Sequence, residues 1–219
     1  MIIVGLTGSI GMGKSTAARI LRDEYNIPVH DADATVHALM DFGGEAVTPI
    51  LAVFPEAFQT NEHNEKAIDR KKLGRLVFQD PAKLKALENI LHPLVREHTD
   101  SFLLDEFNKG SQLVILDIPL LYETRGEDRC DAVLVVTVSD KTQRERVFAR
   151  DQHMTEERFQ SILEKQVPNK EKCLRADFIL SMEDGIEKAQ QDIEALIPKF
   201  KALKAKRFFE IAKKRGFHV

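Results

Sequence analysis

The chain has 219 residues, of which 43% are hydrophobic and 31% charged, and its formal net charge is −3. This length predicts one domain, or one domain with an insertion, and the apolar content suffices for a sizeable core. The small net charge excludes a general electrostatic attraction to nucleic acid or to membranes. Cys130 and Cys173 are too few for a disulfide framework and lack metal-ligand spacing, which favours reduced thiols in a cytoplasmic protein.

No targeting or membrane segment is expected. No basic region precedes the first apolar stretch, as a secretory signal would require. The longest apolar run, 113–122, contains Asp117 and Pro119 and is too short to span a bilayer.

The first predicted elements flank a glycine-rich loop. Residues 2–6 are largely apolar, as in a buried strand, and residues 15–25 carry apolar side chains at helical spacing. Between them, GSIGMGKS (8–15) satisfies the spacing G-x-x-x-x-G-K-[S/T]. Glycines let backbone N–H groups face a phosphate, and the helix N-terminus adds the positive end of its dipole. This order of strand, loop and helix predicts a nucleoside-triphosphate site rather than a flexible glycine turn.

Residues of this loop have expected roles in binding ATP. Lys14 brings a positive charge to the β- and γ-phosphates, and the Ser15 hydroxyl is placed to ligate Mg²⁺. The other expected ATP-binding residues of the loop are Gly8, Gly11, Met12, Gly13 and Thr16. A dinucleotide-binding G-x-G-x-x-G is excluded, because Gly11 and Gly13 have the first spacing but position 16 is Thr.

The next part of the chain is predicted to be mainly helical. Residues 27–33 form a second short strand that ends in acidic residues, and a helix over 34–40 follows it. No strand is expected in 45–110, where residues 60–66 form a polar loop. Asp69 caps a further helix, and Asp80 caps another that Pro93 is expected to kink or divide.

Strands and helices alternate in the remainder of the chain. Near-continuous apolar runs at 113–119 and 131–139, and a short one at 177–180, are typical of a parallel sheet. The expected fold is therefore α/β, with a five-stranded parallel sheet flanked by helices. The expected core is 1–44 with 111–219, including a lid at about 144–175, and the expected acceptor-binding insertion is helical and covers 45–110.

Two further features fit a phosphoryl-transfer site. Asp117 ends an apolar strand, where such proteins place an acidic residue near Mg²⁺, although it could instead cap a turn. Arg146 and Arg150 lie four residues apart on one face of a predicted helix, with Arg144 beside them. They suit a lid that closes over ATP, and the alternative is a solvated helix face paired with Glu145 and Asp151.

Asp33 is the candidate for contact with the acceptor hydroxyl. It is expected at the end of the second strand, at the sheet edge where such folds bind their ligands. An aspartate there could accept or orient the proton of an acceptor hydroxyl. The alternative is a helix N-cap. Asp31, two residues earlier, is expected to point the opposite way.

Seven stretches follow one another over most of the chain: GLTGSIGMGKST, PVHDAD, IDRKKLGRLVF, LENILHPLV, LDIPLLYET, TQRERVFAR and ADFIL. In these stretches the chain resembles the dephospho-CoA kinases, and the resemblance implies a P-loop kinase core with CoA-binding and lid elements. The resemblance implies transfer of the ATP γ-phosphate to the 3′-hydroxyl of dephospho-CoA, which gives CoA and ADP in the last step of CoA biosynthesis. After ADFI (176–179) the sequence continues Leu180-Ser181, where the family often has Asp-Asn or a similar polar pair, so contacts at that strand end stay undefined.

The resemblance also implies roles for individual residues. Asp33 becomes the base, Lys14 the phosphate clamp, and Arg146 and Arg150 the lid arginines. The expected acceptor-binding residues are Asp33, Arg70, His92 and Asp117, and the expected metal ligands are Ser15 and Asp117, the latter through water. Without the resemblance, His92 could be a buried histidine at a helix kink, and Arg70 a surface ion-pair residue.

Two other functions are compatible with the phosphate loop. One is a kinase for another small acceptor, such as a nucleoside monophosphate, and the other is a regulatory nucleotide switch. A nucleotide switch specific for guanine would carry the motif N-K-x-D. The related stretch NKEK (169–172) ends in Lys instead, which disfavours the nucleotide switch. The expected partners are dephospho-CoA and ATP, the latter with Mg²⁺, and no nucleic acid or membrane is expected to bind. The protein is expected to be a cytoplasmic monomer or weak homo-oligomer. A solvated helix is the expected role of the basic C-terminal stretch 199–216.

Overall fold

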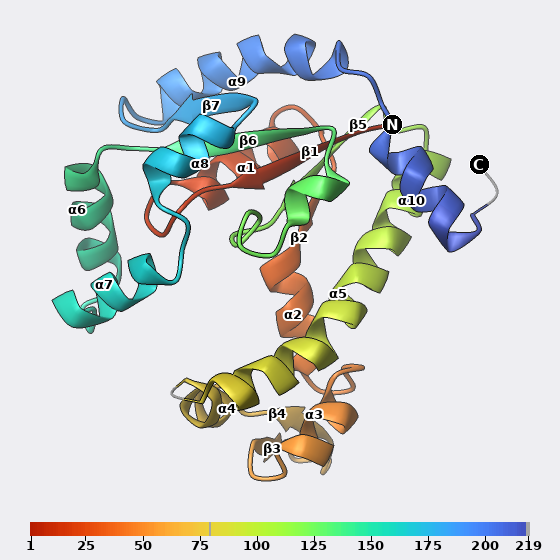
Figure 1. Cartoon of the computed structure of the whole chain (residues 1–219), viewed down its shortest axis with the longest axis vertical. Coiled ribbons are helices and arrows are strands. Elements are labelled where there is room, and N and C mark those ends of the chain that lie inside the picture. Colours follow the sequence, from red (N-terminus) through yellow and green to blue (C-terminus); the bar gives the residue numbers. More distant parts are fainter. Residues whose placement is uncertain (79, 218–219) are drawn as a thin grey trace. The chain divides into compact units, whose positions relative to one another are not determined.

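The computed structural model describes residues 1–78 and 80–217, which form two compact units (Figure 1). One unit is Met1–His30 with Leu103–Val219, and the other is Asp31–Phe102. The second unit contains most of the insertion expected at 45–110 but begins earlier in the chain. Acceptor binding by that insertion, and a lid at 144–175, stay predictions.

The first unit is built on the expected five-stranded sheet. Its strand order is β2-β5-β1-β6-β7, and β1 pairs in parallel with both of its neighbours. All six residues of β1 are buried, as in a parallel sheet covered on both faces. The strands are β1 (Ile2–Thr7), β2 (Val29–Asp31), β5 (Leu113–Asp117), β6 (Ala132–Thr137) and β7 (Phe178–Ser181).

Helices flank this sheet. Buried residues of α1 (Lys14–Asp23) and α9 (Ile186–Lys201) share one hydrophobic cluster with alternate residues of the central strands. The C-terminal helix α10 (Arg207–Arg215) is anchored by Phe208, whose ring stacks on Phe107 at 4.5 Å between centroids. The remaining elements of this unit are α6 (Asp140–Arg150), α7 (Glu156–Glu164), α8 (Asn169–Arg175) and a 3₁₀ helix, η1 (Gly126–Arg129).

The second unit has a hydrophobic cluster of its own, which includes Ile50, Phe54 and Leu73. Its helices are α2 (Ala32–Met40), α3 (Val47–Val53), α4 (Arg70–Val77) and the N-terminal part of α5 (Pro81–Asn108). Asp69 caps α4, and its side chain accepts hydrogen bonds from the Lys71 and Lys72 amides. Asp80 receives the amides of Ala82 and Lys83 at the start of α5, so both caps were predicted correctly.

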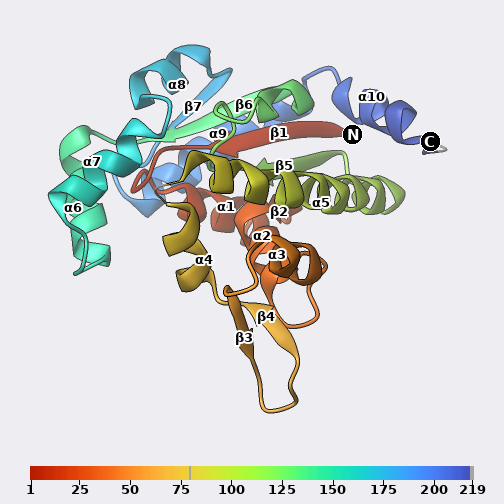
Figure 2. The ribbon, with the colours of Figure 1, turned by 60° about the horizontal axis from the view of Figure 1, so that its bottom comes forward.

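The expectation that this part of the chain contains no strand is wrong. An antiparallel hairpin of β3 (Phe58–Thr60) and β4 (Lys66–Ile68) occurs where no strand was expected (Figure 2). All three residues of β3 are exposed, so the strand lacks the apolar alternation that would identify it. Pro93 was expected to kink or divide its helix; division does not occur, because α5 runs as one helix from Pro81 to Asn108, and a kink at Pro93 stays a prediction. Packing on both sides of Pro93, where Leu91 and Leu103 are buried, supports the continuous helix.

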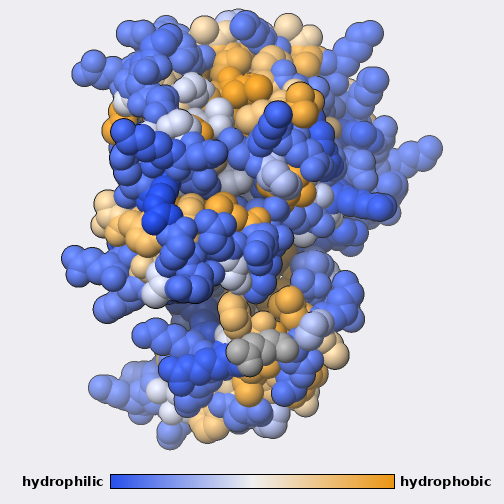
Figure 3. Space-filling view, turned by 60° about the vertical axis from the view of Figure 1, so that its left-hand side comes forward, coloured by the Kyte–Doolittle hydropathy of each residue, from blue (hydrophilic) through white to orange (hydrophobic). Residues whose placement is uncertain are grey.

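The molecular surface is mainly hydrophilic on the face shown in Figure 3, with scattered apolar patches. Such scattered patches are ordinary on a protein surface. In the part of the chain that the structure describes, no helix combines the length and apolar content needed to cross a bilayer.

Candidate active site

The phosphate loop joins β1 to α1, as the motif predicted. Gly11 and Gly13 have φ of +78° and +93°, which is the left-handed region where a side chain is strained. At Gly8 a Cβ would lie 2.8 Å from the Val136 carbonyl oxygen, so only glycine fits. Met12 is buried, and its Sδ accepts a hydrogen bond from the Val138 amide at 3.2 Å. The loop is thus packed against the end of β6.

Lys14 and Asp117 form an ion pair beside this loop, with 2.5 Å between Nζ and Oδ1. Lys14 is the first residue of α1 rather than part of a solvent-facing loop, and its side chain is only 15% exposed. Asp117 ends β5, paired in register with Leu6 of β1, and is buried. A phosphate that binds Lys14 must therefore compete with the Asp117 carboxylate.

The side chains at this position fit a magnesium ion that is bound with a nucleotide. Ser15 is exposed next to Lys14, and Asp117 supplies a carboxylate. Mg²⁺ commonly takes one or two protein oxygens and completes its shell with phosphate oxygens and water. Among the described residues, no group of three or more His, Cys, Asp or Glu side chains could hold a metal by itself. This donor set therefore suits a metal that arrives with phosphates.

The arginines of α6 make different contacts. Arg146 donates from Nη2 to the Met182 carbonyl at 2.8 Å, which ties α6 to the segment after β7. Arg144 pairs with Glu156 of α7, and Arg150 is exposed at the C-terminal end of α6. Glu145 and Asp151 were the acidic partners expected for these arginines on a solvated helix face. Instead, Glu145 forms an ion pair with Lys141, and Asp151 forms one with Arg158. Roles for Arg146 and Arg150 in ATP binding stay predictions.

Glu183 strengthens the same connection between α6 and the segment after β7. Its carboxylate accepts hydrogen bonds from the Thr142 hydroxyl and from the amide and hydroxyl of Ser139, the N-cap of α6. These bonds, that from Thr142 first, hold the pKa of Glu183 below its usual value. Sequence reasoning missed Glu183, because its partners are distant along the chain.

A cavity of about 500 Å³ lies beside the phosphate loop, and this volume is within the range of ligand-binding pockets. Its walls come from Ser9 of the loop, Gln143 and Arg144 of α6, Phe159 of α7, and Gln166. All these residues belong to the first unit. The cavity lies at the part of the chain where a lid was expected.

The second unit carries Asp33, Arg70 and His92. Asp33 does not end a strand, because β2 stops at Asp31 and Asp33 lies exposed in the first turn of α2. The N-cap is Asp31, whose Oδ1 accepts from the Ala34 amide at 2.9 Å. The N-cap alternative for Asp33 is therefore wrong, and so is its expected place at the strand end.

Arg70 and His92 are both exposed. Arg70 is the first residue of α4, after the cap Asp69, whose pKa is lowered by hydrogen bonds from the Lys72 and Lys71 amides. The expectation that His92 is buried at a helix kink is wrong, since its side chain lies on the surface of α5. Exposure leaves both side chains available to a ligand, and their acceptor-binding role stays a prediction.

Comparisons of the sequence with known proteins identify one family. A model of the dephospho-CoA kinase family matches residues 2–188. A dephospho-CoA kinase of Rhodopseudomonas palustris is 45% identical over 197 residues, which are 90% of this chain and 94% of that protein. One from Paramagnetospirillum magneticum is 52% identical over 172 residues, or 78% of each chain.

Two solved structures are similar to this chain along nearly its whole length. The structure of TT1252 from Thermus thermophilus matches with a TM-score of 0.75 and 35% sequence identity. The match covers 90% of this chain and 97% of TT1252. The dephospho-CoA kinase from Campylobacter jejuni has a TM-score of 0.61 and 26% identity, with 90% and 96% covered.

Proposed function

Because this chain belongs to the dephospho-CoA kinase family, we propose that it transfers the γ-phosphate of ATP to the 3′-hydroxyl of dephospho-CoA. The products are CoA and ADP. The family match over residues 2–188 is the observation that carries the proposal, since the phosphate loop alone fits many kinases and switches.

The donor side of the reaction is assigned to the phosphate loop. Residues from Gly8 to Thr16 surround the phosphates of ATP with main-chain N–H groups, as their glycines allow. Lys14 leaves Asp117 and stabilises the negative charge of the transferred phosphoryl group. Ser15 and, through water, Asp117 would hold a Mg²⁺ ion that arrives with ATP, and this ion would neutralise phosphate charge.

Arg146 and Arg150 are proposed to bind the donor nucleotide from α6. Arg146 is held at the Met182 carbonyl, while Arg150 is exposed at the end of the helix. Fixed guanidinium groups stabilise negative charge that develops during phosphoryl transfer.

The acceptor side of the reaction is assigned to the second unit. Asp33 is proposed as the base that accepts or orients the proton of the 3′-hydroxyl. The Asp33 carboxylate is exposed. Asp31 caps the N-terminus of α2, so the Asp33 side chain is not needed for capping. Arg70 and His92 are proposed to bind dephospho-CoA.

Release of ADP by the purified protein tests this function. ATP and Mg²⁺ are supplied with dephospho-CoA, AMP, dTMP or no acceptor. ADP should form rapidly with dephospho-CoA and only at background rate in the other three reactions. Faster ADP formation with AMP or dTMP would indicate a nucleoside-monophosphate kinase, and acceptor-independent hydrolysis would indicate a nucleotide switch. The predictions of a cytoplasmic location and of a monomer or weak homo-oligomer are separate from this test.

A further inference from the structure

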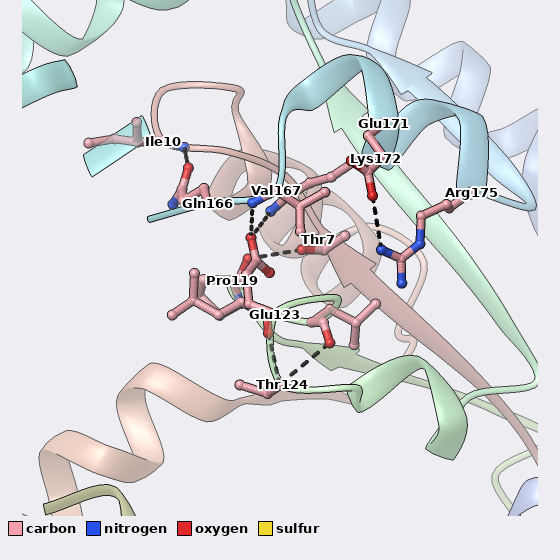
Figure 4. A network of polar contacts seen from close by, with 12 residues as sticks. Thr7, Ile10, Pro119, Glu123, Thr124, Gln166, Val167, Glu171, Lys172 and Arg175 are labelled. Carbon is pink, nitrogen blue, oxygen red and sulfur yellow. Dashed lines mark hydrogen bonds and ion pairs between the residues drawn. The ribbon is translucent and has the colours of Figure 1, made fainter. Parts of the chain in front are cut away.

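Two glutamines hold the main chain of the phosphate loop at Ile10. The Ile10 N–H donates to Gln166 Oε1 at 3.2 Å, and its carbonyl accepts from Gln143 Nε2 at 2.7 Å. Gln143 is only 4% exposed in α6, whereas Gln166 lies in the segment between α7 and α8 (Figure 4). The position of the loop therefore depends on the position of that segment.

Glu123 holds the segment in turn. Its Oε1 accepts a hydrogen bond from the Val167 amide, the residue after Gln166, at 2.8 Å. The same oxygen lies 2.9 Å from Nζ of Lys172, a fully buried lysine in α8 (Figure 4). A buried ammonium group next to Glu123 fixes the direction of its carboxylate.

The loop is also connected to the Glu123 region at its other end. Thr7, the last residue of β1, donates from its hydroxyl to the Pro119 carbonyl at 3.0 Å. Pro119 lies four residues before Glu123 in the stretch that follows β5. Thr7 and Ile10, on either side of Gly8, are thus bonded to Pro119, four residues before Glu123, and to Gln166, next to Val167, which Glu123 binds.

The ion pair is poorly built for stability alone. Within the described residues, Glu123 Oε2 and Lys172 Nζ have no well-aligned hydrogen bond, although both atoms are buried. A buried pair whose hydrogen bonds are incomplete does not usually stabilise a protein more than apolar side chains of the same size would. Fixing one arrangement of the main chain is the better-supported use of such a pair.

We propose that Glu123 is a positioning residue for the donor nucleotide. With Lys172 as its counter-charge, it places Val167 and Gln166 so that the Ile10 main chain keeps the phosphate loop ready to bind. This inference rests on the proposed function of the loop. Glu123 does not contact the reacting atoms in this account, so its removal should weaken nucleotide binding more than it slows the chemical step.

Two double variants isolate this role. Glu123→Gln/Lys172→Met removes both charges but keeps an oxygen that can accept the Val167 N–H. Glu123→Leu/Lys172→Met removes the charges and the acceptor. The first should bind ADP and use ATP within about threefold of the parent, because the hydrogen bond is kept. The second should raise the Kd for ADP and the KM for ATP about tenfold, the effect of roughly one lost hydrogen bond. The KM for dephospho-CoA should not change.

A neighbouring ion pair provides the control. Arg175 of α8 lies 2.6 Å from Glu127 of η1, yet neither residue contacts Gln166 or Val167 in the bonds described. Glu127→Gln should therefore leave the Kd for ADP unchanged. Gln166→Leu, which keeps the Glu123–Lys172 pair, should repeat the tenfold loss, and it tests the proposal even if a double variant fails to fold.

Hydrogen–deuterium exchange gives an independent readout. Amides in residues 5–16 should exchange faster in Glu123→Leu/Lys172→Met and at the parental rate in Glu127→Gln. Parental ADP affinity in both Glu123→Leu/Lys172→Met and Gln166→Leu would overturn the proposal, as would an equal loss in Glu127→Gln. If the parent itself binds no ADP, the proposed function fails rather than this inference.

Discussion

Replacement of Lys14 by methionine should destabilise the unliganded protein as well as inactivate it. Methionine keeps most of the methylene chain, so the variant mainly removes the ammonium group that lies 2.5 Å from Asp117 Oδ1. The Asp117 side chain is 3% exposed and would remain as a buried charge without this partner. Removing one member of a buried pair costs about 3–5 kcal/mol. Since Lys14 keeps 15% exposure, we expect a loss of about 2–3 kcal/mol.

Thermal unfolding measures this effect. For a chain of 219 residues, 1 kcal/mol corresponds to about 2–4 °C, so Lys14→Met should lower the Tm by about 4–12 °C. Lys14→Met/Asp117→Asn, which has no buried charge at this place, should recover most of the Tm. Both variants should lose at least about a hundredfold in turnover. A Lys14→Met variant with the parental Tm would refute the buried ion pair, and one with near-normal turnover would refute the role of the loop.

Three further predictions concern the rest of the first unit. Arg146→Ala should raise the KM for ATP about tenfold or more, because Arg146 is proposed to bind the donor nucleotide. The Tm should change little, because one part-buried hydrogen bond to the Met182 carbonyl is lost. Unchanged kinetics at limiting ATP would favour a purely structural role. The lowered pKa of Glu183 means that its carboxylate stabilises the fold above its ordinary pKa and loses this effect as pH falls through the lower folded value. The Tm difference between the parent and Glu183→Gln should therefore be constant from about pH 7 to 5 and shrink below about pH 4. A Tm difference that grows in acid would contradict a lowered pKa of Glu183. Burial raises the pKa of the Cys130 thiol to about 12. A thiol reagent at about pH 8 should therefore modify only Cys173 of the two cysteines in the native protein. Two rapidly reacting thiols would contradict the burial of Cys130.

The parts of the site that depend on short stretches of chain could be predicted from the sequence. The phosphate loop is such a case, since its glycines and Lys14 act at fixed spacing within one strand-loop-helix unit. The caps Asp69 and Asp80 are others, because each cap binds amides two or three residues later. The three central strands of the sheet, β1, β5 and β6, followed from apolar runs that are buried on both faces.

The remaining features depend on contacts that leave no local pattern. Gln143 binds the Ile10 carbonyl from 133 residues away along the chain, and an isolated glutamine on a helix gives no sign of such a partner. The β3–β4 hairpin was missed because the exposed strand β3 lacks apolar alternation. Asp31 and Asp33 are two residues apart and equally good caps by type, so only the structure identifies Asp31 as the cap.

The central claim, a kinase with a hydroxyl acceptor activated by Asp33, is tested most directly by the turnover of Asp33→Asn with dephospho-CoA. The matched control is Asp31→Asn, because asparagine caps a helix about as well as aspartate and should preserve turnover and Tm. For Asp33→Asn we predict parental ATP affinity and Tm, with turnover lowered about a hundred- to ten-thousandfold, the range of general-base catalysis. Turnover of Asp33→Asn within a few-fold of the parent would contradict the claim.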